Sequence, residues 1–523
     1  MNSSTDTTPF LTAEEWKAFK HNMNDFYIIM TSMLKFLMQA GFAFLEMGAV
    51  RSKNTTNILM KNILDSAIGS LVYWIFGYAL AFGEESNFFC GYSNFLLIDL
   101  TPDMYSNYFF HFVFAATATT IVSGAMAERT QFSAYFAYSF VITGIVYPIV
   151  SHWAWADNGW LKVDCWWEGI EFVDFAGCGV VHMVGGMAGL MGTLALGPRL
   201  DQYVDGKRQR VKGHTVPMMS LGAFILFFGF FAFNGGSQAS ITEEGDGNAI
   251  ANILKNTILS GSCGGLFVVL LFYIVNRKFT LLGCINGMIT GMVAIGAGCD
   301  VIDHWGACVV GLIGGFIFVF YSELLFKLGV DDPLDAMAVH FGGGSWGLIA
   351  VALFAKNTGI VYQWDEHSLK VLAWNVVGGL ALTAWTIATT GPMFFGLKYM
   401  GLLRVSEEVE RHGLDLMEHG EEAYPGDAYL VEDVFKKLLL RGNSAITGDF
   451  QDELVEREHI SVEEVKRKES QGQQAARKSG DSTVVEMSQM NGGYAPSPPQ
   501  QTKKEGGAIE NVKFRLRSDE EKF

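Results

Sequence analysis

The sequence of 523 residues predicts an all-α polytopic membrane protein with eleven transmembrane helices, built as two five-helix inverted repeats plus one extra helix. Half of the residues are hydrophobic and only 17% are charged, against about 25% in soluble domains. Residues 401–523 hold 42 charged residues and residues 1–400 hold 49, so the long N-terminal part is too poor in charge for a water-exposed surface. The net charge of −17 argues against a nucleic-acid partner, because phosphate backbones repel an acidic protein.

Eleven apolar runs can each cross a bilayer core, which requires about 20 mostly apolar residues per helix. Gly, Ser and Thr are spread through these runs, and such small residues allow transmembrane helices to pack closely. We therefore expect a tight helix bundle rather than separate membrane anchors. The predicted spans cover residues 27–49, 62–83, 105–126, 133–152, 175–198, 217–238, 250–275, 284–300, 305–326, 336–355 and 371–396.

Lys and Arg are concentrated in every second predicted loop, and such basic loops stay on the cytoplasmic side of a membrane. We therefore expect the N-terminus outside and the C-terminal tail in the cytoplasm. The polar start, Met1–Asn24, lacks the apolar core of a signal peptide, so the first helix is expected to be its own insertion signal. The basic set comprises Arg51, Lys53, Lys61, Arg129, Arg199, Lys207, Arg208, Arg210, Lys212, Arg277, Lys278 and Lys327.

The chain divides into four parts by composition. Residues 1–26 are expected to be an extracellular segment, and residues 27–400 form the transmembrane domain. Residues 401–442 show apolar periodicity and are expected to be an ordered cytoplasmic tail segment. Residues 443–523 are expected to be mostly disordered, because Gln, Ser, Gly and Pro dominate much of this stretch.

Two segments, 181–190 and 339–348, share the pattern V-H-x-x-G-G-x-x-G-L. By the helix count, the first enters the bilayer from outside and the second from inside, as in the inverted repeats of many transporters. His182 and His340 occupy the same slot of the repeat. At about 1.5 Å per residue, both reach the middle of the bilayer from opposite faces.

An ionisable residue inside a membrane is costly, and it is by default a functional candidate. Two neutral imidazoles can hydrogen-bond to each other and leave one further polar atom each for a small molecule or a proton. The alternative is that each histidine only satisfies a carbonyl group of a neighbouring helix. A metal site is disfavoured, because no Cys or carboxylate shares those helix turns, and we expect no cofactor.

Further short motifs are found at Phe114–Thr117, Gly124–Phe132, Tyr147–Trp155, Asp174–Gly177, Phe233–Ser237 and Asp331–Asp335, and in the tail at Gly413–Asp415, His419–Gly420 and Ala423–Tyr424. Together with the repeat, these motifs resemble the ammonium transporter family, Amt/Mep/Rhesus, and are most similar to its Amt branch. The resemblance covers most of residues 25–425.

The resemblance implies a homotrimer in the lipid bilayer with one pore per subunit, and ammonium or ammonia as substrate, with methylammonium as an analogue. Aromatic faces attract a partly desolvated cation, and a hydroxyl oxygen can accept one of its N–H groups. The matching positions are Trp155, Phe114, Ser237 and Asp174 for substrate binding, Phe114 and Phe233 for a pore gate, and His182 and His340 for the pore lining.

Each of these positions also has a purely structural interpretation. Trp155 could belong to an interfacial aromatic belt, as tryptophans near membrane surfaces often do. Ser237 could hydrogen-bond only to its own helix. Asp174, just ahead of the fifth helix, could serve only as its N-terminal cap.

The tail departs from the plant-type members of the family. Those members carry a regulatory threonine two residues before the His-Gly element, and this chain has Met417 there. A kinase or other cytosolic regulator would need another tail site, such as Ser444, Ser461 or Thr483. In the predicted outer loops, Cys90 and Cys165 could form a disulfide.

The sequence therefore favours an ammonium transporter of the plasma membrane that takes up the cation at an aromatic vestibule and conducts ammonia, with or without the proton. One alternative is an ammonium sensor that signals through the long tail, and another is a gas channel of the Rhesus type. An enzyme using the two histidines as acid and base is disfavoured, because no nucleophile or metal constellation accompanies them.

Overall fold

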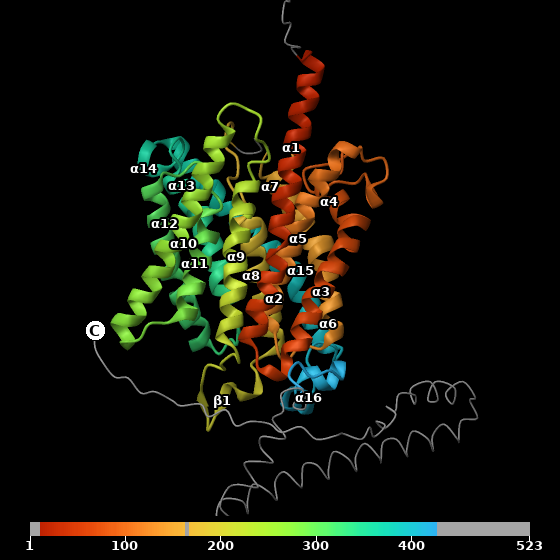
Figure 1. Ribbon diagram of the computed structural model, residues 1–523, viewed down its shortest axis with the longest axis vertical. Helices are drawn as coiled ribbons and strands as arrows, with labels where there is room; N and C mark the ends of the chain where they lie inside the picture. Colours follow the sequence, from red (N-terminus) through yellow and green to blue (C-terminus); the bar gives the residue numbers. More distant parts are fainter. Residues whose placement is uncertain (1–10, 163–166, 426–523) are drawn as a thin grey trace, which may run out of the picture. The chain divides into compact units, whose positions relative to one another are not determined.

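Ten helical segments of the computed structural model, which describes residues 11–162 and 167–425, are long and apolar enough to cross a membrane. They confirm the predicted all-α, multi-pass architecture (Figure 1). The run predicted at 284–300 corresponds to a shorter helix, α11 (Leu281–Ile295), of 15 residues. Ten of the eleven predicted spans are therefore long enough to cross a membrane, and the total of eleven transmembrane helices stays a prediction.

Most spans consist of one long α-helix, and several combine two helices across a short turn. The α-helices besides α11 are α1 (Ala13–Phe36), α2 (Met38–Ala49), α3 (Thr55–Val72), α4 (Tyr78–Phe82), α5 (Tyr105–Met126), α6 (Phe132–Val141), α7 (Tyr147–Trp155), α8 (Val184–Leu196), α9 (Val216–Gly236), α10 (Asp246–Asn276), α12 (His304–Leu328), α13 (Gly343–Phe354), α14 (Ile360–Gln363), α15 (Glu366–Tyr399) and α16 (Glu407–His412).

Turns of π-helix interrupt or extend several of these helices, and such turns are frequent at functional sites. They are η2 (Tyr73–Gly77), η5 (Ile142–Val146), η6 (Cys178–Met183), η8 (Met337–Gly342) and η9 (Asp415–His419). Short 3₁₀ turns lie at Ser52–Asn54, Phe95–Leu97, Pro102–Met104 and Leu200–Gln202. The strands β1 (Tyr203–Val204) and β2 (Lys207–Arg208) form a small antiparallel hairpin.

The two halves of the repeat cross at close range around equivalent glycines. A Cβ atom on Gly186 of α8 would lie 2.5 Å from the backbone nitrogen of Phe341. A Cβ atom on Gly344 of α13 would lie 2.3 Å from the carbonyl oxygen of Cys178. Only glycine allows backbones to approach this closely. Because positions 186 and 344 are the same slot of the repeat, each half provides the gap that the other half fills.

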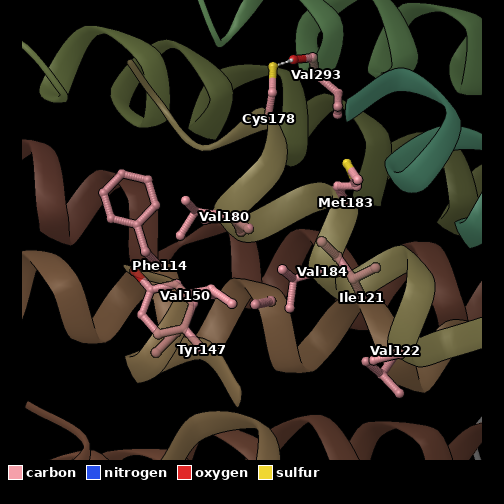
Figure 2. Close-up of a cluster of buried hydrophobic side chains, with 14 of the residues drawn as sticks. Phe114, Ile121, Val122, Tyr147, Val150, Cys178, Val180, Met183, Val184 and Val293 are labelled. Atoms are coloured by element: carbon pink, nitrogen blue, oxygen red, sulfur yellow. Dashed lines mark hydrogen bonds between the residues drawn. The ribbon is translucent and has the colours of Figure 1, made fainter. Parts of the chain in front are cut away.

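Helix α5 lies at the centre of the bundle and is almost entirely buried. Figure 2 shows Val180 and Val184 of the η6–α8 segment among Phe114 and Ile121 of α5. In the same view, the Cys178 thiol donates a hydrogen bond of 2.7 Å to a carbonyl oxygen of α11. This packing fixes the start of η6, and therefore His182, against two neighbouring helices.

Residues 405–425 return to the end of the bundle that carries the β1–β2 hairpin, opposite the start of α1 (Figure 1). Lys53 Nζ donates to the carbonyl oxygen of Glu410 at 2.9 Å, and Asp415 accepts the backbone N–H of Asn57 at 2.8 Å. The tail segment therefore contacts both the turn between α2 and α3 and the beginning of α3. The remainder of the predicted segment 401–442, from residue 426 on, and the predicted disordered part 443–523 lie outside the described residues.

Lys61 was assigned to a basic loop by its sequence position, and this assignment is wrong. It lies inside α3, fully buried, with its Nζ 3.2 Å from a carboxylate oxygen of Glu46 and 3.4 Å from one of Asp65. A buried cation is tolerated when opposite charges and hydrogen bonds surround it. Helix α3 begins at Thr55, before the start at residue 62 that the sequence predicted. Lys61 was placed in a predicted loop because of its charge, but the two carboxylates allow this charge to be buried in the helix.

Candidate functional site

Two histidines from the two repeat segments face each other in the middle of the bundle. His182 lies in η6 and His340 in η8, and their Nδ1 atoms are 3.2 Å apart. The rings are stacked, with centroids 5.2 Å apart and planes inclined by 16°. Both side chains are buried. The structure thus brings the two sequence-predicted histidines into direct contact.

A hydrogen bond between two Nδ1 atoms determines where the protons lie when both rings are neutral. One ring carries its proton on Nδ1 and donates it, so its Nε2 is a bare acceptor. The other ring accepts at Nδ1, so its Nε2 carries an N–H donor. The pair therefore offers one acceptor and one donor to a small polar molecule. Nε2 of His182 is buried and has no hydrogen-bond partner among the described residues.

Two phenylalanine rings close the space next to His182. Phe114 of α5 and Phe233 of α9 meet edge to face, with ring centroids 4.7 Å apart and planes inclined by 74°. The Phe233 ring centroid is 5.1 Å from that of His182. Both phenylalanines are buried. The two residues predicted as a gate are therefore in contact, and their gating role stays a prediction.

Trp155 lies at the end of α7, half-buried, with its ring centroid 5.6 Å from that of Phe114. Its indole N–H donates to the backbone carbonyl of Asp174 at 2.9 Å. The Asp174 carboxylate is buried and accepts backbone N–H groups at distances between 2.7 and 3.1 Å from Gly177, Cys178, Gly179 and Val180. Asp174 thus caps η6, and it orients Trp155 through its backbone rather than through its carboxylate.

Ser237 follows the last residue of α9, half-buried, one turn beyond Phe233. Its hydroxyl group donates to the carbonyl oxygen of Phe233 at 2.9 Å, which is the local hydrogen bond of the structural interpretation. The hydroxyl oxygen keeps its lone pairs, so it can still accept a hydrogen bond from a cation.

Three residues near the gate were missed by the sequence analysis. The ring centroid of Phe110 is 5.0 Å from that of Phe114, and the ring of His111 lies 6.0 Å from that of Trp155. Lys35 of α1 is fully buried, and its Nζ lies 3.4 Å from the centroid of the Phe114 ring. The sequence did hold a signal for Lys35, because a lysine within an apolar run is rare inside membranes and is by default a functional candidate.

On the other side of the histidine pair, a small cavity borders His340. Its polar lining comes from His340, Glu46 and Asn286, and the rest is apolar. The Glu46 carboxylate also accepts hydrogen bonds from Lys61 and from Asn62, at 3.2 and 2.8 Å. The cavity therefore continues from the histidine pair towards a buried polar network between α2 and α3.

The end of the bundle near the tail is held by buried ion pairs. Arg199 bonds to both carboxylate oxygens of Asp331, at 2.8 and 2.9 Å, and also to Glu128. Burial by itself would raise the pKa of Glu128, but the guanidinium groups of Arg199 and Arg51 outweigh it and hold the pKa at about 2. Arg404 pairs with Glu410 at 2.8 Å and extends this network into the tail.

Within residues 11–162 and 167–425, no group of three His, Cys, Asp or Glu side chains is placed to hold a metal ion. The predicted pairing of Cys90 with Cys165 falls partly outside the described residues, because Cys165 belongs to the undescribed stretch 163–166.

A multi-pass helix bundle with a buried polar pair in its interior, next to two buried phenylalanine rings, is typical of membrane proteins of the transporter class. Comparison with known proteins gives the family. The family model described as "Ammonium Transporter Family" matches residues 26–424, and the chain belongs to this family.

Individual relatives agree with this assignment. The chain is 40% identical over 402 residues to ammonium transporter 1 member 1 of Arabidopsis thaliana, covering 72% of this chain and 80% of the relative. It is 36% identical over 436 residues to ammonium transporter 1 member 3 of Solanum lycopersicum, covering 78% and 95%.

Solved structures show the same fold. A structure titled "Sensor Amt Protein" matches with a TM-score of 0.72 and 33% identity, covering 77% of this chain and 100% of that chain. Candida albicans Mep2 matches with a TM-score of 0.66 and 26% identity, covering 74% and 87%. The family and the fold class predicted from the motifs are thereby confirmed.

Proposed function

We propose that the chain carries ammonium across the plasma membrane along the path from the aromatic gate to the histidine pair. The observation that supports this most directly is the contact between the two Nδ1 atoms, 3.2 Å apart, immediately next to the gate. The pair exposes one donor and one acceptor inside an otherwise apolar path. Ammonia has three N–H groups and one lone pair, so it matches both.

Recruitment begins at the aromatic side chains around Phe114. The ring faces of Phe110, Phe114 and Trp155 attract a cation that has lost part of its hydration shell. The hydroxyl oxygen of Ser237 accepts one N–H group. Asp174 contributes through the cap that positions η6 and through the carbonyl that holds Trp155, rather than by direct ligation.

Selectivity follows from what lies beyond the gate. K⁺ is similar in size to ammonium, but it has no N–H groups and cannot lose a proton. A narrow apolar passage strips its water without replacing it, which is costly. Ammonium can leave its proton on the entrance side, pass as ammonia and interact with each Nε2 atom in turn.

The test is uptake of ammonium and labelled methylammonium in cells that lack their own ammonium transporters. The wild-type chain should support uptake, and the double variant His182→Leu/His340→Leu should lose selective passage while it still reaches the surface. His304→Leu, which changes an exposed histidine at the start of α12, is the matched control. Unchanged ammonium selectivity in the double variant would return both histidines to a purely structural role.

The orientation is part of the proposal: N-terminus outside, tail in the cytoplasm, and three copies per assembly. The segregation of Lys and Arg supports the orientation, and the trimer rests on similarity to the family. A tag at residue 10 should be accessible in intact cells. A tag accessible only after permeabilisation would contradict this orientation.

A sensing role through the tail is the alternative. The contacts of Glu410 and Asp415 with Arg404 and the α2–α3 turn favour communication between the tail and the bundle. These contacts suit regulation of transport equally well, so we keep transport as the proposed function and treat the tail as its regulatory element. A cytosolic kinase or other regulator remains part of this proposal.

A further inference from the structure

Lys35 presents an amino group to the aromatic gate from inside the protein. Its Nζ lies 3.4 Å from the centroid of the Phe114 ring, 3.7 Å from that of Phe110 and 5.8 Å from that of Phe233. The side chain is fully buried. The group therefore occupies the aromatic surface on which an ammonium ion would be recruited.

The amino group of Lys35 has no hydrogen-bond acceptor among the residues that the structure describes. The other buried lysine of the bundle, Lys61, differs in this respect, because it lies next to Glu46 and Asp65. An amino group without an acceptor is costly to remove from water. For Lys35 the ring faces are the compensation, so these rings form a site that holds an amino head even without a carboxylate.

The chemistry of this head group matches the substrate of the proposed function in either protonation state. A protonated lysine ends in an alkylammonium, which is equivalent to a tethered methylammonium. A neutral lysine ends in an alkylamine, which is equivalent to ammonia with one N–H replaced by carbon. Ring faces that hold a protonated lysine by cation–π contact can hold an ammonium ion in the same way, and a neutral amine can donate an N–H group to the same faces.

We infer that Lys35 is a built-in occupant of the ammonium recruitment site and that external ammonium must displace it before entering the gate. This inference rests on the proposed function and adds a specificity-determining residue to it. A site that is open for only a fraction of the time shows an affinity reduced by that fraction. Lys35 therefore raises the KM for ammonium without taking part in the passage itself.

The rotation of the gate follows from the same contacts. The amino group sits on the rings of Phe110 and Phe114, and Phe114 is the gate ring that meets Phe233. While the lysine occupies Phe114, this ring is held in the closed position. A free ammonium ion on the same ring is not tethered to α1, so replacing the lysine removes this restraint and couples recruitment of the substrate to opening.

The test compares Lys35→Met, which keeps the length of the side chain and removes the amino group, with the wild type and with Lys35→Arg, which keeps a cation. Lys255→Met is the matched control, because Lys255 lies on α10 and contacts Asn252 away from the gate. The KM for ammonium is measured from its competition with the uptake of labelled methylammonium, and the maximal rate from methylammonium uptake at saturation. Surface abundance is measured for each variant. The full-length purified protein is also tested for the shift in Tm caused by added ammonium chloride.

If Lys35 occupies the site about nine-tenths of the time, Lys35→Met should lower KM about tenfold with an unchanged or higher maximal rate. Lys35→Arg should keep a KM at or above that of the wild type, and Lys255→Met should match the wild type. Ammonium should raise the Tm of Lys35→Met more than that of the wild type, because binding no longer has to displace the lysine.

Two results would overturn the inference. An unchanged KM together with an unchanged ammonium-induced Tm shift in Lys35→Met would mean that the lysine only fills space. Loss of transport at normal surface abundance would mean that the amino group is required for passage and is not a competitor. If Lys35→Met does not fold, the KM and the ammonium-induced Tm shift of Lys35→Gln are measured instead and interpreted in the same way. Absence of uptake by the wild type itself would instead contradict the proposed function.

Discussion

The Nδ1 atoms of His182 and His340 lie 3.2 Å apart, although the two residues are separated by 158 positions in the chain. His182 lies in the π-helical turn η6, directly before α8, and His340 lies in η8, directly before α13. Gly186 of α8 and Gly344 of α13 allow the backbone of the other repeat half to approach closely. Neither half of the repeat can build the pair alone. A change of charge at either position should therefore alter the whole path.

Replacing one histidine by a carboxylate should change which ions pass. His340→Glu places a potential anion next to His182, beside the cavity whose existing carboxylate, Glu46, is already paired with Lys61. K⁺ or Na⁺ therefore gains an anionic partner where the wild type has a neutral ring. We expect K⁺ to carry measurable current in this variant, whereas the wild type responds to ammonium alone. The measurement is current during pulses of ammonium and then of K⁺. A variant that still excludes K⁺ would argue that the histidines do not line the path.

Removing one ring of the gate should weaken discrimination at the entrance. Phe233→Ala removes the edge-to-face contact of Phe114 with Phe233 and opens a space beside His182. We expect K⁺ to compete with methylammonium uptake in this variant, and the free energy of unfolding to fall by about 3–5 kcal/mol. Phe224→Ala is the control, because Phe224 is exposed on the same helix, α9. Equal K⁺ sensitivity in both variants would contradict a gate at Phe233.

The ion pairs of Glu128 should make stability depend on pH in the acid range. Its pKa is lowered from the ordinary value of 4.5 to about 2, so ionised Glu128 stabilises the fold above about pH 4.5. This contribution, at most about 3 kcal/mol, is lost as the pH falls towards 2. Thermal unfolding of the purified protein between pH 5 and pH 3 measures it. Glu128→Gln should lower Tm at neutral pH and flatten this dependence, whereas Asp201→Asn, at an exposed partner of Arg51, should change little.

Docking of the tail should depend on Gly413 more than on Gly420. Gly413 has a φ of +107°, and an added Cβ atom would lie 2.6 Å from the Cβ of Lys53. Gly413→Ala should therefore displace the tail and, if the tail couples the subunits, lower the maximal transport rate about fivefold or more at normal surface abundance.

Gly420→Asn is the control for this experiment. Gly420 has a φ of +67° with open space around it, and asparagine tolerates this left-handed conformation. Its transport should stay close to that of the wild type. Full activity of Gly413→Ala, or of a chain truncated after Leu403, would show that tail docking does not influence transport.

The sequence alone was sufficient for features that depend on composition along the chain. Apolar run length, the alternation of basic loops and the repeated V-H-x-x-G-G-x-x-G-L pattern are one-dimensional signals. They predicted the membrane-spanning helices and the equivalence of His182 and His340. The motifs around Phe114, Trp155 and Phe233 predicted the family.

The tertiary structure alone decided which groups become partners. Lys35 and Lys61 are both lysines near apolar runs, yet one lies on aromatic rings and the other between two carboxylates. The sequence offered both a ligand role and a capping role for Asp174, and the folded structure shows its carboxylate bonded to four backbone N–H groups while its carbonyl oxygen holds Trp155. The physical reason is that a charged side chain is buried, and then needs a compensating group, only when distant helices pack together. The local sequence around a lysine does not specify which side chains of other helices it will contact.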